Sequence, residues 1–253
     1  MNKPSFRSTK ATFYILVLFL LVGVLMAMAI FAASASAAKK PIAKNIIVLI
    51  ADGRGFNHIK ATDYYAYSNK AGQVYERFPF RMAMSTYMDY NEDEACYGQG
   101  YDPAAAWSAF DYVTECYTDS AAAATAMSTG TKSYYGAIGV DMDMNPLTHL
   151  LEMAESRGKS TGVITSVEWT HATPAGHVAH NVLRDNYAEI GQEMVYESAA
   201  DVIMGAGHPW YGHDGQPLDE PNTFKYVGGE TTWDDLVAGI AGGDANGDGV
   251  DDP

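Results

Sequence analysis

A continuous apolar run at residues 46–51 constrains the fold more than any other feature of the sequence. Ile46 to Ala51 contains no polar residue, a pattern typical of a strand buried on both faces of a parallel sheet. Further strand and helix candidates alternate along the chain. The strand candidates are residues 82–88, 161–167 and 201–205, and the helix candidates are residues 57–68, 146–157 and 187–198. This alternation predicts an α/β layered fold with a largely parallel sheet.

The first 38 residues have the pattern of a secretory signal peptide. Three basic residues, Lys3, Arg7 and Lys10, precede a stretch at 11–38 that carries no charge and ends in small residues suited to cleavage. The apolar part is also long enough to cross a bilayer, so membrane anchoring through residues 11–38 is the alternative. Both readings predict an exported protein that is periplasmic, extracellular or anchored facing outward.

The charge balance is strongly acidic once the signal is removed. Residues 39–253 contain 13 basic and 31 acidic residues, a formal net charge of −18, which argues against nucleic-acid binding. An anionic substrate would need metal ions or a well-placed arginine to offset that background. Two cysteines, Cys96 and Cys116, suggest one disulfide in an exported chain, with two free buried thiols as the alternative.

An alanine-rich segment at residues 118–130 places a serine at the start of a helix. Asp119 is a good N-cap, alanines follow, and Gly130 can end the helix in the left-handed conformation. Ser120 then lies in the first turn, where free backbone N–H groups and the helix dipole favour an anion. On local sequence alone, an ordinary helix start explains the same residues.

Other candidate site residues follow the predicted strands. Asp52 comes directly after the first strand, and residues 168–173 follow a later one, so both segments can reach a single crevice with Ser120. Serine is a weak nucleophile until a base or a metal activates it. Because the glycines of a Gly-x-Ser-x-Gly elbow are missing, metal activation fits better, with carboxylate, hydroxyl and histidine ligands that suit Mg²⁺ and Zn²⁺.

From about Lys44 to Gly207 the chain closely resembles the alkaline phosphatase family. The motifs agree in order and spacing, and they occupy residues 45–55, 113–114, 118–126, 128–132, 136–141, 171–175, 179–180 and 199–207. The resemblance implies a three-layer α/β sandwich around a largely parallel sheet, incomplete in this chain. It also implies hydrolysis of phosphate monoesters, and it leaves open a homodimer.

The resemblance assigns catalytic roles by matching positions. Ser120 matches the nucleophile that becomes a phosphoserine, and Arg184, four residues after His180, matches the arginine that grips the phosphoryl oxygens. Asp119 would help to hold that arginine. Because the assignment of Arg184 depends on spacing, a surface helix residue is its alternative.

The resemblance also implies two Zn²⁺ ions and one Mg²⁺ ion. Asp52 matches the carboxylate shared by one Zn²⁺ and the Mg²⁺, and Thr173 matches a hydroxyl ligand of the Mg²⁺. His171 falls where family members carry Asp or His near that same metal. Each assignment has an alternative. Asp52 could cap a turn, Thr173 could be a structural threonine before Pro174, and His171 could be an exposed loop histidine.

The sequence departs from the family pattern in three places. Arg54 replaces a usual methionine, and residues 88–113 form an unusual insertion. The family's remaining metal ligands lie in a C-terminal half that has no counterpart here, so residues 39–243 correspond to the N-terminal part of the domain. We expect a piece of a longer protein, because Ser120 and Arg184 have no evident use without those ligands; a truncated relative is the alternative.

The acidic end of the chain, residues 244–253, carries a separate signal. Its oxygen-bearing residues alternate with glycines, as in calcium-binding loops, and the candidate ligands are Asp244, Asn246, Asp248 and Asp252. An acidic, solvated linker explains the segment equally well. The calcium signal leaves a non-catalytic secreted calcium-binding or surface protein as one rival function. The other rival is a related phosphodiesterase or sulfatase, which would use threonine or a modified residue as nucleophile.

Overall fold

The structure is a computed structural model of the 253-residue chain. It describes Tyr14 and residues 43–68, 70–84, 86–89, 103–109, 111–115, 117–198 and 200–242. The predicted signal peptide at residues 1–38 (apart from Tyr14), Cys96, Cys116 and the calcium-loop candidates at 244–253 lie outside the described residues. Residues 1–50 and 51–253 form two separate units.

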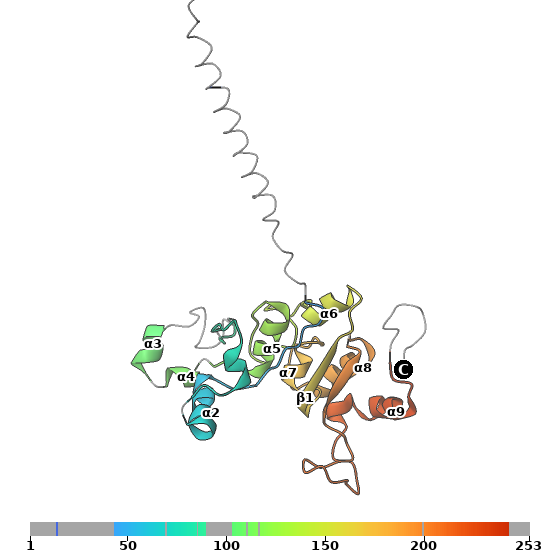
Figure 1. The fold of residues 1–253 in the computed structure, drawn as a ribbon. Helices are drawn as coiled ribbons and strands as arrows, with labels where there is room; N and C mark the ends of the chain where they lie inside the picture. Colours follow the sequence, from blue (N-terminus) through green and yellow to red (C-terminus); the bar gives the residue numbers. More distant parts are fainter. Residues whose placement is uncertain are drawn as a thin grey trace, which may run out of the picture. The chain divides into compact units, whose positions relative to one another are not determined.

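The second unit contains a parallel sheet of two strands (Figure 1). Strand β1 spans Gly162–Glu168 and strand β2 spans Val202–Ala206, which confirms two of the strand predictions. Val163 is in register with Ile203, and Ile164 with Met204. Val163 and Ile203 pack against the core, whereas Ile164 and Met204 are exposed on the opposite face. The described sheet therefore has one covered face and one open face.

The three helices predicted at 57–68, 146–157 and 187–198 and the predicted alanine-rich helix after Asp119 all form, and further helices are present in addition. The α-helices are α2 (Phe56–Tyr67), α3 (Pro103–Ser108), α4 (Tyr112–Glu115), α5 (Ser120–Thr129), α6 (Leu150–Glu155), α7 (Ala172–Ala175), α8 (Tyr187–Tyr196) and α9 (Glu230–Ala238), and the 3₁₀ turns are η1 (Val74–Arg77) and η2 (Lys225–Val227). Helix α6 is shorter than the predicted residues 146–157, because His149 occupies the N-cap position and residues before it form a turn and a bridge. Among the described residues, no helix has the length and hydropathy that a bilayer crossing requires.

Two predicted strands are not strands in the structure. The run at 46–50, in the first unit, has exposed side chains and no strand pairing, and residues 82–84 are likewise irregular and exposed. An apolar segment forms a strand only where a neighbouring segment pairs with it through ladder hydrogen bonds. The described part of the chain offers neither segment such a neighbour.

Helix α5 forms as the sequence predicts. The Asp119 side chain accepts a hydrogen bond from the Ala122 N–H at 3.0 Å, which caps the first turn. Gly130 ends the helix with φ at 78°, in the left-handed region that favours glycine. The small side chains of Ala121 and Ala124 are fully buried, so neighbouring segments approach the helix closely.

The hydrophobic core joins α5, α7 and α8 to the covered face of the sheet. Its buried members are Ala121, Ile138, Ala172, Ala175, Val178, Ala179, Ile190 and Met194. Helix α5 lies beside α7, which in turn contacts β1 (Figure 1). This packing holds the N-terminus of α5 at a fixed place relative to the segment after β1.

Candidate active site

Three of the predicted site residues meet at the Asp52 carboxylate. The Ser120 hydroxyl donates a hydrogen bond to Asp52 Oδ2 at 2.8 Å, and the Thr173 hydroxyl lies 3.3 Å from the same oxygen. The residues come from three distant segments: the turn after residue 51, the first turn of α5 and the body of α7. The fold therefore gathers a potential nucleophile and two further oxygen donors at one point.

Arg184 is fixed by an ion pair with the helix cap of α5. Arg184 Nη1 lies 2.9 Å from Asp119 Oδ2, and only 17% of the arginine side chain and 4% of the aspartate side chain are exposed. Such a charge-assisted pair removes much of the freedom of a long side chain. The contact that the sequence predicts between Asp119 and Arg184 is thus confirmed.

The backbone around Gly136 completes this arrangement. Asp119 Oδ1 accepts from the Gly136 N–H at 3.2 Å as well as from Ala122, and the Gly136 carbonyl accepts from the Arg184 N–H at 2.8 Å. We call Asp119, Gly136 and Arg184 the arginine cradle. The Thr125 hydroxyl, fully buried in α5, donates to the Ala137 carbonyl and accepts from the Gly139 N–H, both at 2.9 Å. These bonds tie the cradle to the middle of α5.

His171 lies beside Arg184 of the cradle, and the charge of Asp52 also acts on it. Its Nε2 is 3.4 Å from Arg184 Nη2, and because a guanidinium only donates, this nitrogen must present its lone pair. Burial, reinforced by the charge of Arg184, lowers the pKa of His171. Its Nδ1 is buried and has no hydrogen-bond partner within the described residues. The ring is therefore neutral at neutral pH and carries its proton on Nδ1, which is left to donate to a bound molecule or water.

The side chains around Asp52 fit part of a metal centre. A carboxylate and two hydroxyls supply the hard oxygen donors that Mg²⁺ prefers. Zinc sites usually need more histidine and carboxylate ligands, and within the described ranges the imidazole beside this group is that of His171. The residues thus fit a magnesium site better than a complete zinc centre.

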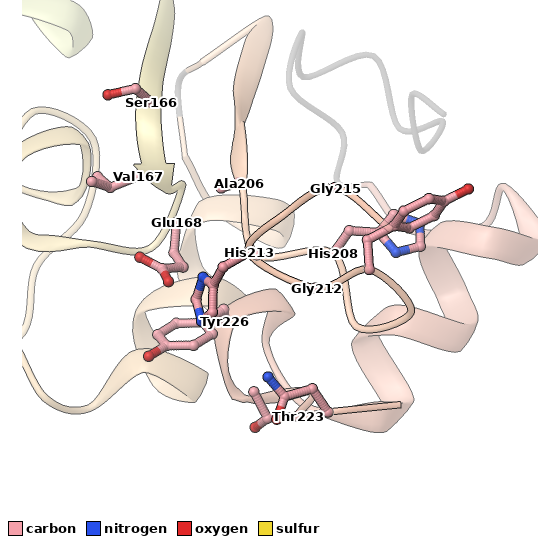
Figure 2. Close-up of a pocket in the computed structure, with 13 residues that line it drawn as sticks. Ser166, Val167, Glu168, Ala206, His208, Gly212, His213, Gly215, Thr223 and Tyr226 are labelled. Atoms are coloured by element: carbon pink, nitrogen blue, oxygen red, sulfur yellow. The ribbon is translucent and has the colours of Figure 1, made fainter. Parts of the chain in front are cut away.

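The structure also contains a hollow that the sequence analysis did not anticipate (Figure 2). It measures about 420 Å³ and lies beyond the carboxyl ends of β1 and β2, with Glu168, His208, His213 and Tyr226 among its lining residues. None of the predicted site residues lines it. The two histidines follow β2 in a loop without any recognisable motif, so local sequence gave no reason to assign them.

Taken together, a parallel α/β scaffold holds a helix-terminal serine, a carboxylate and a fixed arginine close together, a combination suited to binding a phosphoryl group. The sequence model of the alkaline phosphatase family matches residues 43–232. The chain belongs to the alkaline phosphatase family.

Curated relatives support this assignment. The chain is 31% identical over 201 residues to alkaline phosphatase 4 of Bacillus subtilis (strain 168), a match covering 78% of this chain and 39% of the relative. It is 40% identical over 191 residues to the alkaline phosphatase of Escherichia fergusonii, covering 68% of this chain and 37% of the relative. The chain therefore spans less than two fifths of the length of these relatives.

Solved structures agree with the fold. The cold-active alkaline phosphatase of a psychrophilic Shewanella species matches with a TM-score of 0.50 and 36% identity, covering 65% of this chain and 36% of that one. A histidine-to-glutamate mutant of the alkaline phosphatase from the Antarctic bacterium TAB5, with Mg bound in its M3 site, matches with a TM-score of 0.50 and 30% identity. That match covers 68% of this chain and 42% of the mutant.

Proposed function

We propose that the intact protein hydrolyses phosphate monoesters through a phosphoserine at Ser120. The observation that carries this proposal is the joint placement of the Ser120 hydroxyl on Asp52 and of Arg184 on Asp119. In the first step, Ser120 Oγ loses its proton to solvent and forms a bond to phosphorus, while the bond from phosphorus to the leaving alkoxide breaks and the alkoxide takes up a proton from solvent. In the second step, water attacks the phosphoserine, releases inorganic phosphate and restores the serine.

The arginine cradle supplies positive charge to the phosphoryl group. Arg184 uses Nη1 for Asp119, and its remaining N–H groups can donate to the equatorial phosphoryl oxygens. Asp119 sets the direction of the guanidinium before the substrate arrives, so little entropy is lost on binding. The backbone N–H groups of the first turn of α5 add a favourable dipole.

Asp52, Thr173 and His171 are the residues of this chain that would hold metal. Asp52 and Thr173 supply oxygen donors for Mg²⁺, Asp52 is also the carboxylate for one Zn²⁺, and His171 offers the lone pair of Nε2, which lies beside Arg184. When bound, two Zn²⁺ ions and one Mg²⁺ ion would lower the pKa values of the serine hydroxyl and of water and stabilise the developing charge. Until then, Asp52 holds the Ser120 hydroxyl as a hydrogen-bond acceptor.

We also propose that the protein acts outside the cytoplasm, because the signal pattern at residues 1–38 and the acidic composition both fit export. An exported enzyme would hydrolyse phosphate monoesters that are present outside the cytoplasm. The calcium loop at 244–253 and the homodimer stay predictions from the sequence.

Turnover of p-nitrophenyl phosphate by the intact protein at alkaline pH tests the proposal. We expect hydrolysis that is lost on chelation and restored by Zn²⁺ with Mg²⁺, and an Asp52→Asn variant that is not restored. The diester bis(p-nitrophenyl) phosphate is the control, and faster turnover of the diester would favour a phosphodiesterase. Absence of both zinc and turnover, with calcium bound, would instead favour the non-catalytic protein.

A further inference from the structure

His180 lies between two groups that can only accept hydrogen bonds. Its Nδ1 is 2.8 Å from a carboxylate oxygen of Glu193 in α8, and its Nε2 is 2.9 Å from the Leu147 carbonyl oxygen. A neutral imidazole has one N–H and can satisfy only one of these partners. Both contacts are hydrogen bonds only when the ring is a doubly protonated imidazolium.

The surroundings of His180 favour a charged His180 beside a neutral His149, and the two rings are tilted by 37°. His149 is fully buried, and its ring centroid lies 4.4 Å from that of His180. Burial, reinforced by the charges of His180 and His177 and opposed by Glu152, lowers the pKa of His149 to about 4. Burial also opposes the charge of His180, yet the contacts with Glu193, the Leu147 carbonyl and the more distant Glu152 raise the pKa of His180 above its ordinary value. The pair is thus one neutral and one charged ring.

A metal ion is the other explanation for this group of side chains. His149, Glu152 and His180 carry the donor types that zinc takes, and their donor atoms lie within 4.8 Å of one another. However, both nitrogens of His180 already contact oxygen acceptors of the protein. A ring held in that way has no lone pair for a metal, so the geometry favours the ion pair with Glu193.

The same ion pair anchors the segment that carries Arg184. Both oxygens of Glu193 also accept from the His180 backbone N–H at 2.9 Å. The next residue, Asn181, pairs with Ile138 through two backbone hydrogen bonds of 2.8 and 2.9 Å. The Arg184 N–H then reaches the Gly136 carbonyl in the cradle. Residues 180–184 are therefore fixed at one end by Glu193 and at the other by Gly136.

We propose that the His180–Glu193 ion pair is a positioning element that holds Arg184 in place for the phosphoryl group and releases it when His180 loses its proton. The effect of this segment on phosphate binding rests on the proposed function of Arg184. The positioning of the segment does not, because hydrogen exchange of the Arg184 amide measures it directly. His180 is charged below its folded pKa, so the restraint is present at lower pH and is lost as the pH rises through that value.

Nuclear magnetic resonance of the intact protein tests the first part without any variant. The ¹⁵N shifts of His180 should show both nitrogens protonated at neutral pH, and one should lose its proton as the pH rises. Hydrogen-exchange protection of the Arg184 amide, corrected for the intrinsic pH dependence of exchange, should fall about tenfold over that same titration, as expected for loss of one charge-assisted bond. A singly protonated His180 throughout, or unchanged protection of Arg184, would overturn the proposal.

A Glu193→Gln variant tests the second part, with Glu197→Gln as the matched control. Glu197 lies one turn further along, at the C-cap of α8, and is exposed. We expect Glu193→Gln to weaken binding of inorganic phosphate about tenfold at neutral pH, to flatten its pH dependence and to reduce Arg184 protection. Glu197→Gln should match the wild type. Equal phosphate affinity and equal Arg184 protection in the two variants would contradict the proposal. If the wild type binds no phosphate, the proposed function fails, and Arg184 protection still decides the positioning role.

Discussion

The arginine cradle and the β1–β2 sheet belong to the same unit but differ sharply in how deeply the residues in and beside them are buried. Beside the cradle, Ile138 is fully buried, and the cap residue Asp119 is almost so. On the open face of the sheet, Ile164 is 73% exposed and Met204 is 57% exposed. Ile138 and Ile164 are the same residue type, so the difference in their burial comes from the neighbours that the described residues supply. Tertiary contacts within the described residues complete the cradle, whereas the sheet is covered on one face only.

This difference matters for function because hydrogen bonds among the described residues are enough to hold the cradle together. Asp119 meets three partners, and Thr125 joins α5 to the strand-like segment at Ile138. Parallel strands are usually buried on both faces, and the apolar residues on both faces of β1 are typical of that pattern. The arginine side of the proposed phosphoryl site is thus held by contacts that do not involve the open face of the sheet.

The largest contrast is expected from one substitution in each region. Ile138→Ala should lower the free energy of unfolding by about 2–5 kcal/mol, because it removes buried methyl groups and leaves a cavity. Ile164→Ala should change it by less than about 0.5 kcal/mol, because the side chain is mostly exposed. Denaturant unfolding of the two variants measures both. A comparable loss at Ile164 would show that its face is covered in the intact protein and would remove the contrast.

The pH dependence of stability should come from the buried region. Because the pKa of His149 is about 4 in the folded state, against 6.5 for an ordinary histidine, the unfolded chain takes up this proton first as the pH falls. Stability is therefore lost between about pH 6.5 and pH 4. We expect this residue to contribute about 2 kcal/mol of the loss between pH 7 and pH 5.

A His149→Asn variant provides the comparison for that prediction, because asparagine does not titrate. Its free energy of unfolding should be lower at pH 7 but should fall by about 2 kcal/mol less than that of the wild type on going to pH 5. Parallel pH curves for the two proteins would show that His149 is not buried as a neutral ring.

The smallest of these effects concerns the guanidinium of Arg184. Arg184→Lys keeps the positive charge but loses the planar fork that meets Asp119 and the phosphoryl oxygens together. We expect KM for p-nitrophenyl phosphate to rise about tenfold with a smaller change in kcat. Steady-state kinetics measures the split. A fully active lysine variant would mean that charge alone, not the geometry of the cradle, binds the substrate.

Sequence reasoning predicted the elements whose signals are local. The cap at Asp119, the stop at Gly130 and the strands β1 and β2 all appear as expected. The runs at 46–51 and 82–88 did not form strands, because strand formation also depends on a partner that local sequence does not specify.

The sequence predicted those site residues that belong to recognisable motifs. Ser120 and Thr173 both contact Asp52, and Arg184 contacts Asp119, while the catalytic and metal-binding roles that spacing and family motifs assign to these residues stay predictions. The Gly136 contact and the His180–Glu193 pair were missed, because they join residues that share no motif and meet only through tertiary packing. An isolated histidine and glutamate 13 positions apart carry no recognisable signal before the fold is known.

The most direct test of the central claim is to trap the covalent intermediate on the intact protein. After incubation with ³²P-labelled phosphate monoester and acid quenching, the label should reside on the peptide that contains Ser120, as identified by mass spectrometry. A Ser120→Ala variant that retains the wild-type fold and metal content should carry no label and lose at least about 10³-fold in kcat. Label retained by the Ser120→Ala variant, or found on another residue of the wild type, would contradict the assignment of Ser120 as the phosphoryl acceptor.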